Sequence, residues 1–88
     1  MYYVYLLMCS DNSIYCGITD NLEKRLKTHN NAKGAKYTRT RLPVRLMYSE
    51  TAENKSAALK REYEIKKYSR KKKLELINKD VLLSENLK

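Results

Sequence analysis

The sequence contains no phenylalanine and no tryptophan, and its 88 residues include only two cysteines, two glycines, one proline and one histidine. Two cysteines and one histidine are too few for a disulfide framework or a four-ligand zinc site. No stretch approaches the roughly 20 apolar residues of a membrane span, and no basic segment followed by a long apolar run opens the chain. We therefore expect a cytoplasmic protein with no membrane partner.

The length of the chain favours a single compact domain, because a protein of this size buries only about 60% of its unfolded surface in one core. We expect the domain to comprise residues 1–80, with residues 81–88 as a C-terminal tail. All eight aromatic residues are tyrosines. A buried tyrosine must find a partner for its hydroxyl, so this bias indicates that some of the rings serve chemistry.

The charge of the chain narrows the class of partner. Nineteen lysines and arginines against ten acidic residues give a formal charge of +9. Such an excess favours a polyanion through counterion release, and nucleic acid is the leading candidate. The alternative is that the lysines only keep a small protein in solution.

The first twenty residues have the pattern of a β-hairpin. Residues 2–9 are aromatic, β-branched and apolar, residues 10–13 are typical of a turn, and residues 14–19 are again strand-like. Gly17 indicates a bulge or a close approach of the backbone.

The loop length decides which face of the sheet each tyrosine occupies. A three-residue loop, Asp11 to Ser13, places Tyr5 and Tyr15 on the same face, whereas a two-residue loop places them on opposite faces. The residues alone leave both registers open.

The rest of the chain alternates helices, a loop and one strand. Asp20 and Glu23 resemble a capping box, and the leucines that follow have helical spacing. We expect a helix to about residue 30, an exposed basic loop over 30–43, a strand over 44–49, and helices over about 54–69 and 70–78.

One carboxylate lies on an unexpected face of a predicted helix. At about 100° per residue, Leu59 projects to one side of Glu62, and Ala58 and Ile65 project to the other. Glu62 therefore lies within the apolar arc that these three residues form. A carboxylate facing a core is costly unless it is paired or bound to a metal. It is therefore either part of a structural salt bridge with a basic residue on a neighbouring element, or a ligand of Mg²⁺, which accepts one carboxylate together with waters and phosphate oxygens.

The first predicted helix shows a similar displacement. Arg25 borders the stripe formed by Leu22 and Leu26, and His29 lies one turn beyond it. The guanidinium could bind a phosphate through its planar fork, or the side chain could simply extend to solvent. His29 could belong to the same site or be a core residue with a satisfied ring.

Together these residues resemble a known family. Tyr3-Val4-Tyr5, then Tyr15-Cys16-Gly17, then Arg25 and His29 on one helix and Glu62 on a later one, are similar in order and spacing to the GIY-YIG nuclease superfamily. The small stand-alone bacterial members are the most similar, in the segments YVYLLMCSDNSIYCGIT and GAKYTRTRLP. The resemblance covers residues 2–77, and it departs at Tyr3, Val4 and Cys16, which replace the flanking residues of the two tripeptides.

The resemblance implies an α+β fold, in which helices flank a small three-stranded antiparallel sheet and both tyrosines share one working face. It also implies roles. Glu62 matches the metal-binding carboxylate, Arg25 the phosphate-binding arginine, Tyr5 and Tyr15 the motif tyrosines, and His29 a frequent further member of the site. Asn78 is the one candidate for an asparagine that some members carry beyond the metal-binding helix.

The expected activity is that of an endonuclease that hydrolyses DNA with Mg²⁺ or Mn²⁺, in DNA repair or processing. A water would attack phosphorus while a tyrosine accepts its proton, and a tyrosine, which ordinarily titrates near pH ~10, needs nearby cations for this. Which of the two tyrosines accepts the proton stays open.

The predicted loop supplies a candidate DNA-binding surface of cations and one ring, namely Lys33, Lys36, Tyr37, Arg39 and Arg41. Such a surface binds a phosphate backbone with little base recognition, so we expect the protein to cut branched or single-stranded DNA, or DNA of any sequence. We also expect a monomer. The run from Arg70 to Lys73 either adds phosphate contacts or is a solvated face. Two alternatives are a nucleic-acid-binding module of the same fold without turnover and a small protein whose basic face binds an acidic partner.

Overall fold

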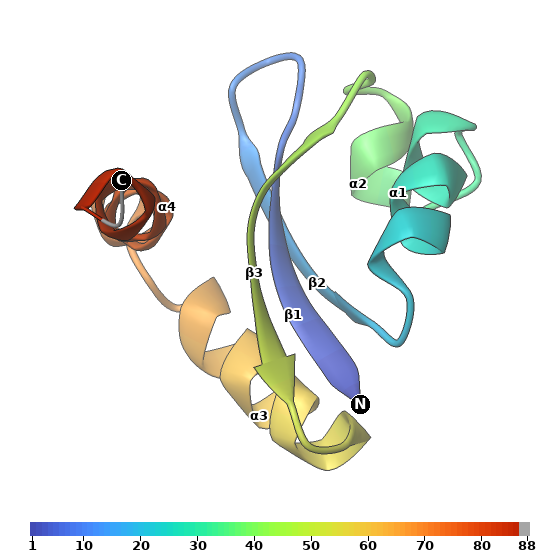
Figure 1. Cartoon of the computed structure of the whole chain (residues 1–88). Helices are drawn as coiled ribbons and strands as arrows, with labels where there is room; N and C mark the ends of the chain where they lie inside the picture. Colours follow the sequence, from blue (N-terminus) through green and yellow to red (C-terminus); the bar gives the residue numbers. More distant parts are fainter. Residues whose placement is uncertain (87–88) are drawn as a thin grey trace.

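The computed structural model describes residues 1–86 and has the expected α+β architecture (Figure 1). Three antiparallel strands form a sheet in the order β2-β1-β3. In chain order the elements are β1 (Tyr2–Met8), β2 (Ile14–Thr19), α1 (Leu22–Asn30), α2 (Lys36–Arg39), β3 (Arg45–Ala52), α3 (Lys55–Lys66) and α4 (Arg70–Asn86).

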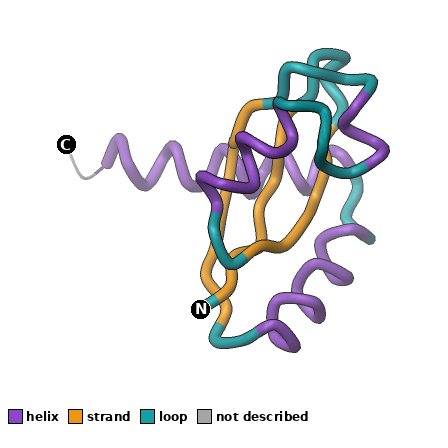
Figure 2. Tube along the Cα trace, turned by 90° about the vertical axis from the view of Figure 1, so that its right-hand side faces the viewer, coloured by secondary structure: helices purple, strands orange, loops and turns teal. Residues whose placement is uncertain are grey.

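The helices cover the two faces of the sheet, so the fold has three layers. Figure 1 shows α1 and α2 on one side of the sheet and α3 and α4 on the other, and Figure 2 shows the end of α4 extending away from the sheet. Each face has its own core, because side chains alternate along β1. The buried residues of the core on the α1 side are Tyr5, Leu7, Cys9 and Val44. Those of the core on the α3 side are Val4, Leu6, Cys16, Ala58, Ile65 and Ile77.

The hairpin between β1 and β2 has a three-residue loop, which is one of the two expected loop lengths. The loop comprises residues 10–12, one residue earlier than the expected 11–13. The Cys9 N–H donates to the Ser13 carbonyl (2.9 Å) and the Asn12 N–H to the Cys9 carbonyl (3.0 Å). Asn12 has a φ of 67°, the left-handed conformation that closes loops of this length. Tyr5 therefore pairs with Gly17, and Leu7 pairs with Tyr15. Because the loop still has three residues, Tyr5 and Tyr15 remain on the same face of the sheet, and both point to the α1 side.

Four details of the helices and strands differ from expectation. Asn21 caps α1, because its side chain, rather than that of Asp20, accepts the Lys24 N–H at 3.1 Å. The strand expected over 44–49 begins and ends later, at Arg45 and Ala52, and the helix α4 continues to Asn86 instead of ending near 78. The segment 30–43 contains the helical turn α2 and is not wholly exposed, since Thr38 within it is buried.

Leu59 was expected on the buried side of α3, and this was wrong, because its side chain is 45% exposed while Ala58 and Ile65 are fully buried. The buried face of α3 is thus narrower than the apolar arc of the sequence suggests. Among residues 1–86 no helix combines the length and the apolar character needed to cross a membrane.

Candidate functional site

Tyr5 is the centre of a cluster on the α1 side of the sheet. Its side chain is only 2% exposed and lies over Gly17 in the neighbouring strand. A Cβ at position 17 would lie 2.5 Å from the Tyr5 hydroxyl oxygen and 2.7 Å from Cζ. Gly17 is therefore needed for close approach, which is one of the two roles expected for it.

His29 lies against the Tyr5 hydroxyl and is completely buried. Its Nε2 is 3.0 Å from the Tyr5 oxygen, and its Nδ1 is 2.8 Å from Oγ1 of Thr38, which is also fully buried. Burial, and then the positive charge of Arg25, lower the pKa of His29 to about 4. The ring is therefore neutral at physiological pH.

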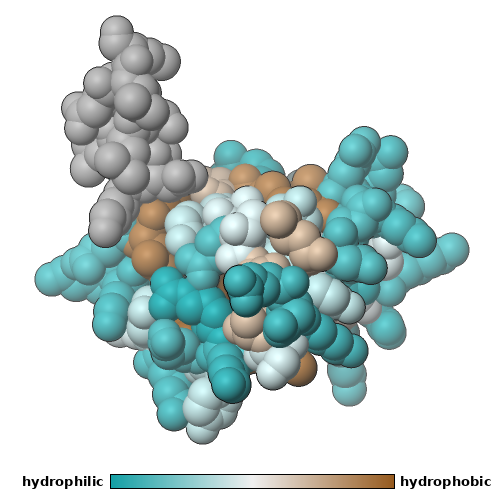
Figure 3. All heavy atoms as spheres, turned by 60° about the horizontal axis from the view of Figure 1, so that its bottom comes forward, coloured by the Kyte–Doolittle hydropathy of each residue, from teal (hydrophilic) through white to brown (hydrophobic). Residues whose placement is uncertain are grey.

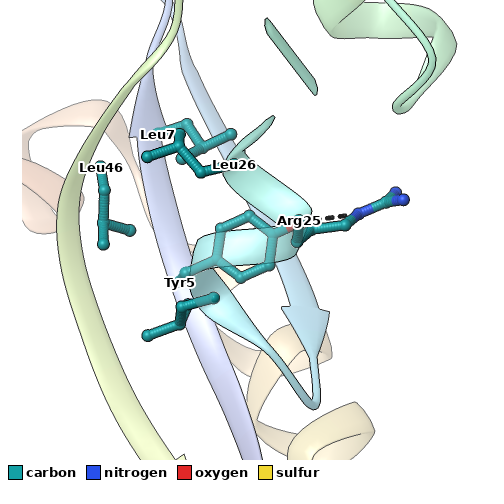
Figure 4. A pocket seen from close by; sticks show the side chains of 6 residues that line it. Tyr5, Leu7, Arg25, Leu26 and Leu46 are labelled. Carbon is teal, nitrogen blue, oxygen red and sulfur yellow. Dashed lines mark hydrogen bonds between the residues drawn. The ribbon is translucent and has the colours of Figure 1, made fainter. Parts of the chain in front are cut away.

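Arg25 reaches the same hydroxyl from α1. Its Nε donates to the Tyr5 oxygen over 3.5 Å, and the rest of the guanidinium points away from the apolar residues beside it (Figure 4). The small pocket drawn there is lined by Tyr5, Leu7, Leu22, Arg25, Leu26 and Leu46. Burial raises the pKa of Tyr5, and the hydrogen bond from Arg25 opposes this rise. The Arg25 side chain thus begins among mainly apolar residues, and its charged guanidinium extends toward solvent.

Tyr15 completes the group of aromatic rings. Its ring centroid lies 6.4 Å from that of Tyr5 and 5.4 Å from that of His29. The ring of Tyr37, from α2, stacks on Tyr15 at 6.1 Å with an angle of 24° between the planes. Tyr15 is half-buried, so it is the more accessible of the two motif tyrosines.

Glu62 lies on α3 and therefore on the other side of the sheet from this cluster. Its side chain is 18% exposed, and its Oε2 is 3.6 Å from Nζ of Lys66, one turn along the same helix. A salt bridge was one of the two expected explanations for this carboxylate, although the partner was expected on a neighbouring element. The structure thus brings Tyr5, Tyr15, Arg25 and His29 together and shows no contact between them and Glu62.

The position of Glu62 is nevertheless close to the strand that carries Tyr15. Burial, and then the negative charge of Glu62, raise the pKa of the Cys16 thiol to about 11. Cys16 follows Tyr15 directly in β2, which lies at the edge of the sheet. Glu62 and Tyr15 therefore approach the same edge strand from opposite faces.

The donor groups near this edge suit a hard cation with few protein ligands. Within residues 1–86, no three His, Cys, Asp or Glu side chains are grouped so that they could hold a metal. Mg²⁺ commonly keeps several waters and binds one or two carboxylates together with substrate phosphates, so Glu62 alone is a sufficient protein ligand.

The basic loop is partly occupied by contacts of its own. Arg41 donates to Asp11 over 3.0 Å and to the Tyr37 carbonyl over 2.8 Å, and its guanidinium carbon lies 3.9 Å from the centre of the Tyr37 ring. Arg39 donates to the Gly34 carbonyl over 3.3 Å. Both lysines, Lys33 and Lys36, are exposed and belong to none of the ion pairs that the structure describes.

The second basic segment begins α4. The Arg70 guanidinium donates to the Asn12 carbonyl over 2.5 Å and so joins α4 to the hairpin loop, while the Lys72 ammonium lies 4.1 Å from the centre of the Tyr68 ring. On the face shown in Figure 3 hydrophilic residues predominate and hydrophobic patches are small. Asn78 is exposed on α4.

Sequence reasoning missed two residues of the cluster, Thr38 and Gly34. Thr38 contacts Nδ1 of His29. A Cβ at Gly34 would overlap the His29 ring. The available signal was that the chain has only two glycines, and each lies against a ring of the same site.

Comparisons with known proteins show which family this chain resembles. The model of the GIY-YIG catalytic domain family matches residues 1–75. A UPF0213 protein of Clostridium perfringens is 57% identical over 86 residues, which cover 98% of this chain and 92% of the relative. A UPF0213 protein of Staphylococcus haemolyticus is 57% identical over 76 residues, or 86% of this chain and 93% of that protein.

Two solved structures resemble this fold as well. The solution NMR structure of a UPF0213 protein from Bacillus halodurans matches with a TM-score of 0.56 and 46% identity, over 89% of this chain and 84% of that one. The solution NMR structure of a protein from E. faecalis matches with a TM-score of 0.57 and 39% identity, over 99% and 88% of the two chains. These matches confirm the resemblance found in the sequence and the predicted fold.

Proposed function

Because this chain belongs to the GIY-YIG family, a superfamily of nucleases, we propose that it is a metal-dependent endonuclease that hydrolyses phosphodiester bonds of DNA. The observation that carries this proposal is the group of Tyr5, Tyr15, Arg25 and His29 on one face of the sheet. A charged guanidinium, two phenols and a neutral imidazole that gather in so small a domain are typical of a site that serves a reaction.

Arg25 is the residue that would bind the scissile phosphate. Tyr5 accepts a hydrogen bond from its Nε, which leaves the terminal nitrogens at the outer end of the side chain (Figure 4). Two parallel N–H groups fit two phosphate oxygens, and their charge offsets the charge that develops there.

Tyr15 is the better candidate for the group that accepts a proton from the attacking water. Its side chain is only half-buried, and it neighbours Arg25. Tyr5 is buried, burial raises its pKa, and its hydroxyl is engaged by His29. We therefore assign Tyr5 to holding Arg25 and Tyr15 to the proton.

Glu62 would hold the divalent ion at the edge of β2. When bound there, Mg²⁺ or Mn²⁺ supplies charge neutralisation on the phosphate oxygens and on the departing oxygen. The nearness of Glu62 to Cys16 supports this role, because Cys16 and Tyr15 are neighbours in the edge strand. Lys66 occupies the carboxylate in the free protein.

The substrate would be recognised mainly through its backbone. The ring of Tyr37 stacks on Tyr15, and the Arg41 guanidinium lies over the Tyr37 ring. The loop that carries Lys33, Lys36, Arg39 and Arg41 therefore borders Tyr15, and cations of this kind position a nucleic acid without recognising its sequence. We propose that the substrate is branched or single-stranded DNA, or DNA of any sequence. The active form would be a monomer, and the protein would repair or process DNA in the cytoplasm.

The test is a cleavage assay on single-stranded, duplex and branched DNA of one sequence, with Mg²⁺, with Mn²⁺ and with chelator. The variant Glu62→Gln removes the proposed ligand, and Glu64→Gln makes the same change on the same helix at a more exposed carboxylate. We expect metal-dependent cleavage that Glu62→Gln abolishes and Glu64→Gln preserves. Cleavage that persists in Glu62→Gln would identify a contaminating nuclease.

The alternative function is a nucleic-acid-binding module without turnover. It is favoured by the salt bridge that occupies Glu62 and by the sheet that separates this residue from Tyr5. Salt-dependent DNA binding with no cleavage under any of these conditions would establish it in place of the nuclease.

A further inference from the structure

A chain of three hydrogen bonds, two of them buried, joins Tyr5 to the backbone carbonyl of Ala35, the N-cap residue of α2. The Tyr5 oxygen is 3.0 Å from Nε2 of His29, Nδ1 of His29 is 2.8 Å from Oγ1 of Thr38, and Oγ1 of Thr38 is 2.9 Å from the Ala35 carbonyl oxygen. His29 and Thr38 have no exposed surface. Water is thus excluded from the middle of the chain, and its members must satisfy one another.

The last bond fixes the direction of the others. A carbonyl has no proton, so the Thr38 hydroxyl must donate to Ala35. Oγ1 of Thr38 can then only accept from His29, which requires the proton of the imidazole to be on Nδ1. A neutral imidazole has one N–H, so Nε2 is an acceptor and receives the Tyr5 hydroxyl proton.

The other end of the chain gives the same direction independently. A guanidinium can only donate, so the Tyr5 oxygen accepts from Nε of Arg25. If Nε2 of His29 also carried a proton, the Tyr5 oxygen would receive two donors, and its own proton would have no acceptor within residues 1–86. The low pKa of His29 agrees with a neutral ring.

We propose that Thr38 is a positioning residue of the active site, whose hydroxyl holds His29 in the Nδ1–H tautomer and so presents the Tyr5 oxygen to Arg25. Thr38 does not touch the substrate. Its catalytic importance rests on the proposed nuclease function, because the group finally oriented is the phosphate-binding guanidinium. The tautomer itself is a property of the folded chain and does not depend on activity.

The local backbone explains why this position carries a threonine. Thr38 lies in the single turn of α2, where its N–H and hydroxyl both donate to the Ala35 carbonyl. Gly34 leaves room for the His29 ring, since a Cβ there would overlap it. The turn therefore brings one hydroxyl against Nδ1 and excludes water from it.

The tautomer can be measured directly, because His29 is the only histidine and its ring nitrogens give the only imidazole ¹⁵N signals of a uniformly labelled sample. We expect a protonated Nδ1 and an unprotonated Nε2 in the wild-type protein at neutral pH. Thr38→Val, which keeps the shape and removes the acceptor, should populate the Nε2–H tautomer. Thr38→Ser should retain the wild-type signals.

Cleavage rates then separate positioning from general stability. Under single turnover, Thr38→Val should cut DNA about tenfold more slowly than wild type, while its DNA dissociation constant changes less than twofold and Thr38→Ser restores the rate. Thr51→Val is the control, because it removes an exposed hydroxyl from β3, and it should leave the rate and the imidazole signals unchanged.

Each result decides the proposal. A wild-type ring protonated on Nε2, or a Thr38→Val ring that remains wholly in the Nδ1–H form, would overturn it. If Thr38→Val fails to fold, the wild-type and Thr38→Ser spectra still test the assigned direction. If the wild-type protein cuts no DNA, the nuclease proposal fails, whereas the spectra still establish whether Thr38 controls the tautomer.

Discussion

The Tyr5 hydroxyl lies 3.0 Å from Nε2 of His29, although β1 and α1 place the two residues 24 positions apart in the chain. The same hydroxyl receives the Arg25 side chain. One phenol in the first strand therefore links Arg25 and His29 of α1, and the site depends on the packing of its ring.

Tyr5→Phe should weaken both the fold and the activity. The change leaves Nε2 of His29 without a donor in a buried position, which costs about 1–3 kcal/mol, and it frees Arg25. We expect a lower free energy of unfolding in urea and at least a tenfold lower cleavage rate. Tyr3→Phe, a half-buried position of the same strand, is the matched control and should change neither quantity appreciably.

Gly17→Ala should be less harmful once the Tyr5 hydroxyl is gone. The added Cβ would lie 2.5 Å from that oxygen, and overpacking of this kind typically costs about 1–3 kcal/mol. A double-mutant cycle with Tyr5→Phe, measured by urea denaturation, should therefore give a positive coupling between the two sites. Strict additivity would show that the Tyr5 hydroxyl does not lie against position 17.

The pH dependence of stability follows from the buried imidazole. Its pKa is about 4 in the folded protein and about 6.5 when the chain is unfolded. Between these values the unfolded state binds a proton that the folded state does not, so the free energy of unfolding should fall as the pH falls from 6.5 toward 4. Urea denaturation between pH 7 and pH 5 measures this slope, and His29→Gln should flatten it.

Much of this fold could be predicted from the sequence, because strand alternation and helical spacing are local properties. The placement of Tyr5 and Tyr15 on the same face of the sheet required only that the loop have an odd number of residues. The position of the loop could not be predicted, since Ser10 to Asn12 and Asp11 to Ser13 are equally suited to turns and only the left-handed Asn12 of the folded protein selects the first.

The site was less predictable than the fold, for two physical reasons. Thr38 lies in a basic, polar segment with no hydrophobic period, so its burial depends on the packing of α2 against His29. The exposure of Leu59 and the burial of the Glu62 side chain depend on how far α3 is rotated against the sheet. Helical projection gives the direction of each side chain, but it does not show how much of the helix surface the sheet buries.

Lys66 should compete with the metal for Glu62. An i,i+4 ion pair on a helix is worth about 0.2–0.5 kcal/mol, so Lys66→Gln should lower the Mg²⁺ concentration for half-maximal cleavage roughly twofold. Lys60→Gln, which removes an exposed charge from the same helix, is the control. An equal shift in both variants would mean that the effect comes from overall charge.

The exposed lysines of the loop should contribute to DNA binding through counterion release. Replacing Lys33 and Lys36 together by alanine should reduce the slope of log affinity against log salt by about 0.9 for each lost phosphate contact. Fluorescence anisotropy over a range of salt concentrations measures the slope. Lys27→Ala is the control, because this lysine of α1 already pairs with Glu23 at 3.8 Å, and a slope equally reduced there would argue against a specific role for the loop.

The central claim is that Glu62, on one side of the sheet, and the tyrosine cluster, on the other, act at the same edge of β2. Paramagnetic broadening of backbone amide signals by Mn²⁺ tests it most directly. We predict broadening of Tyr15 and Cys16 in β2 together with residues around Glu62 in α3, and loss of both effects in Glu62→Gln. Broadening confined to another acidic residue, or unchanged in Glu62→Gln, would contradict the proposed site.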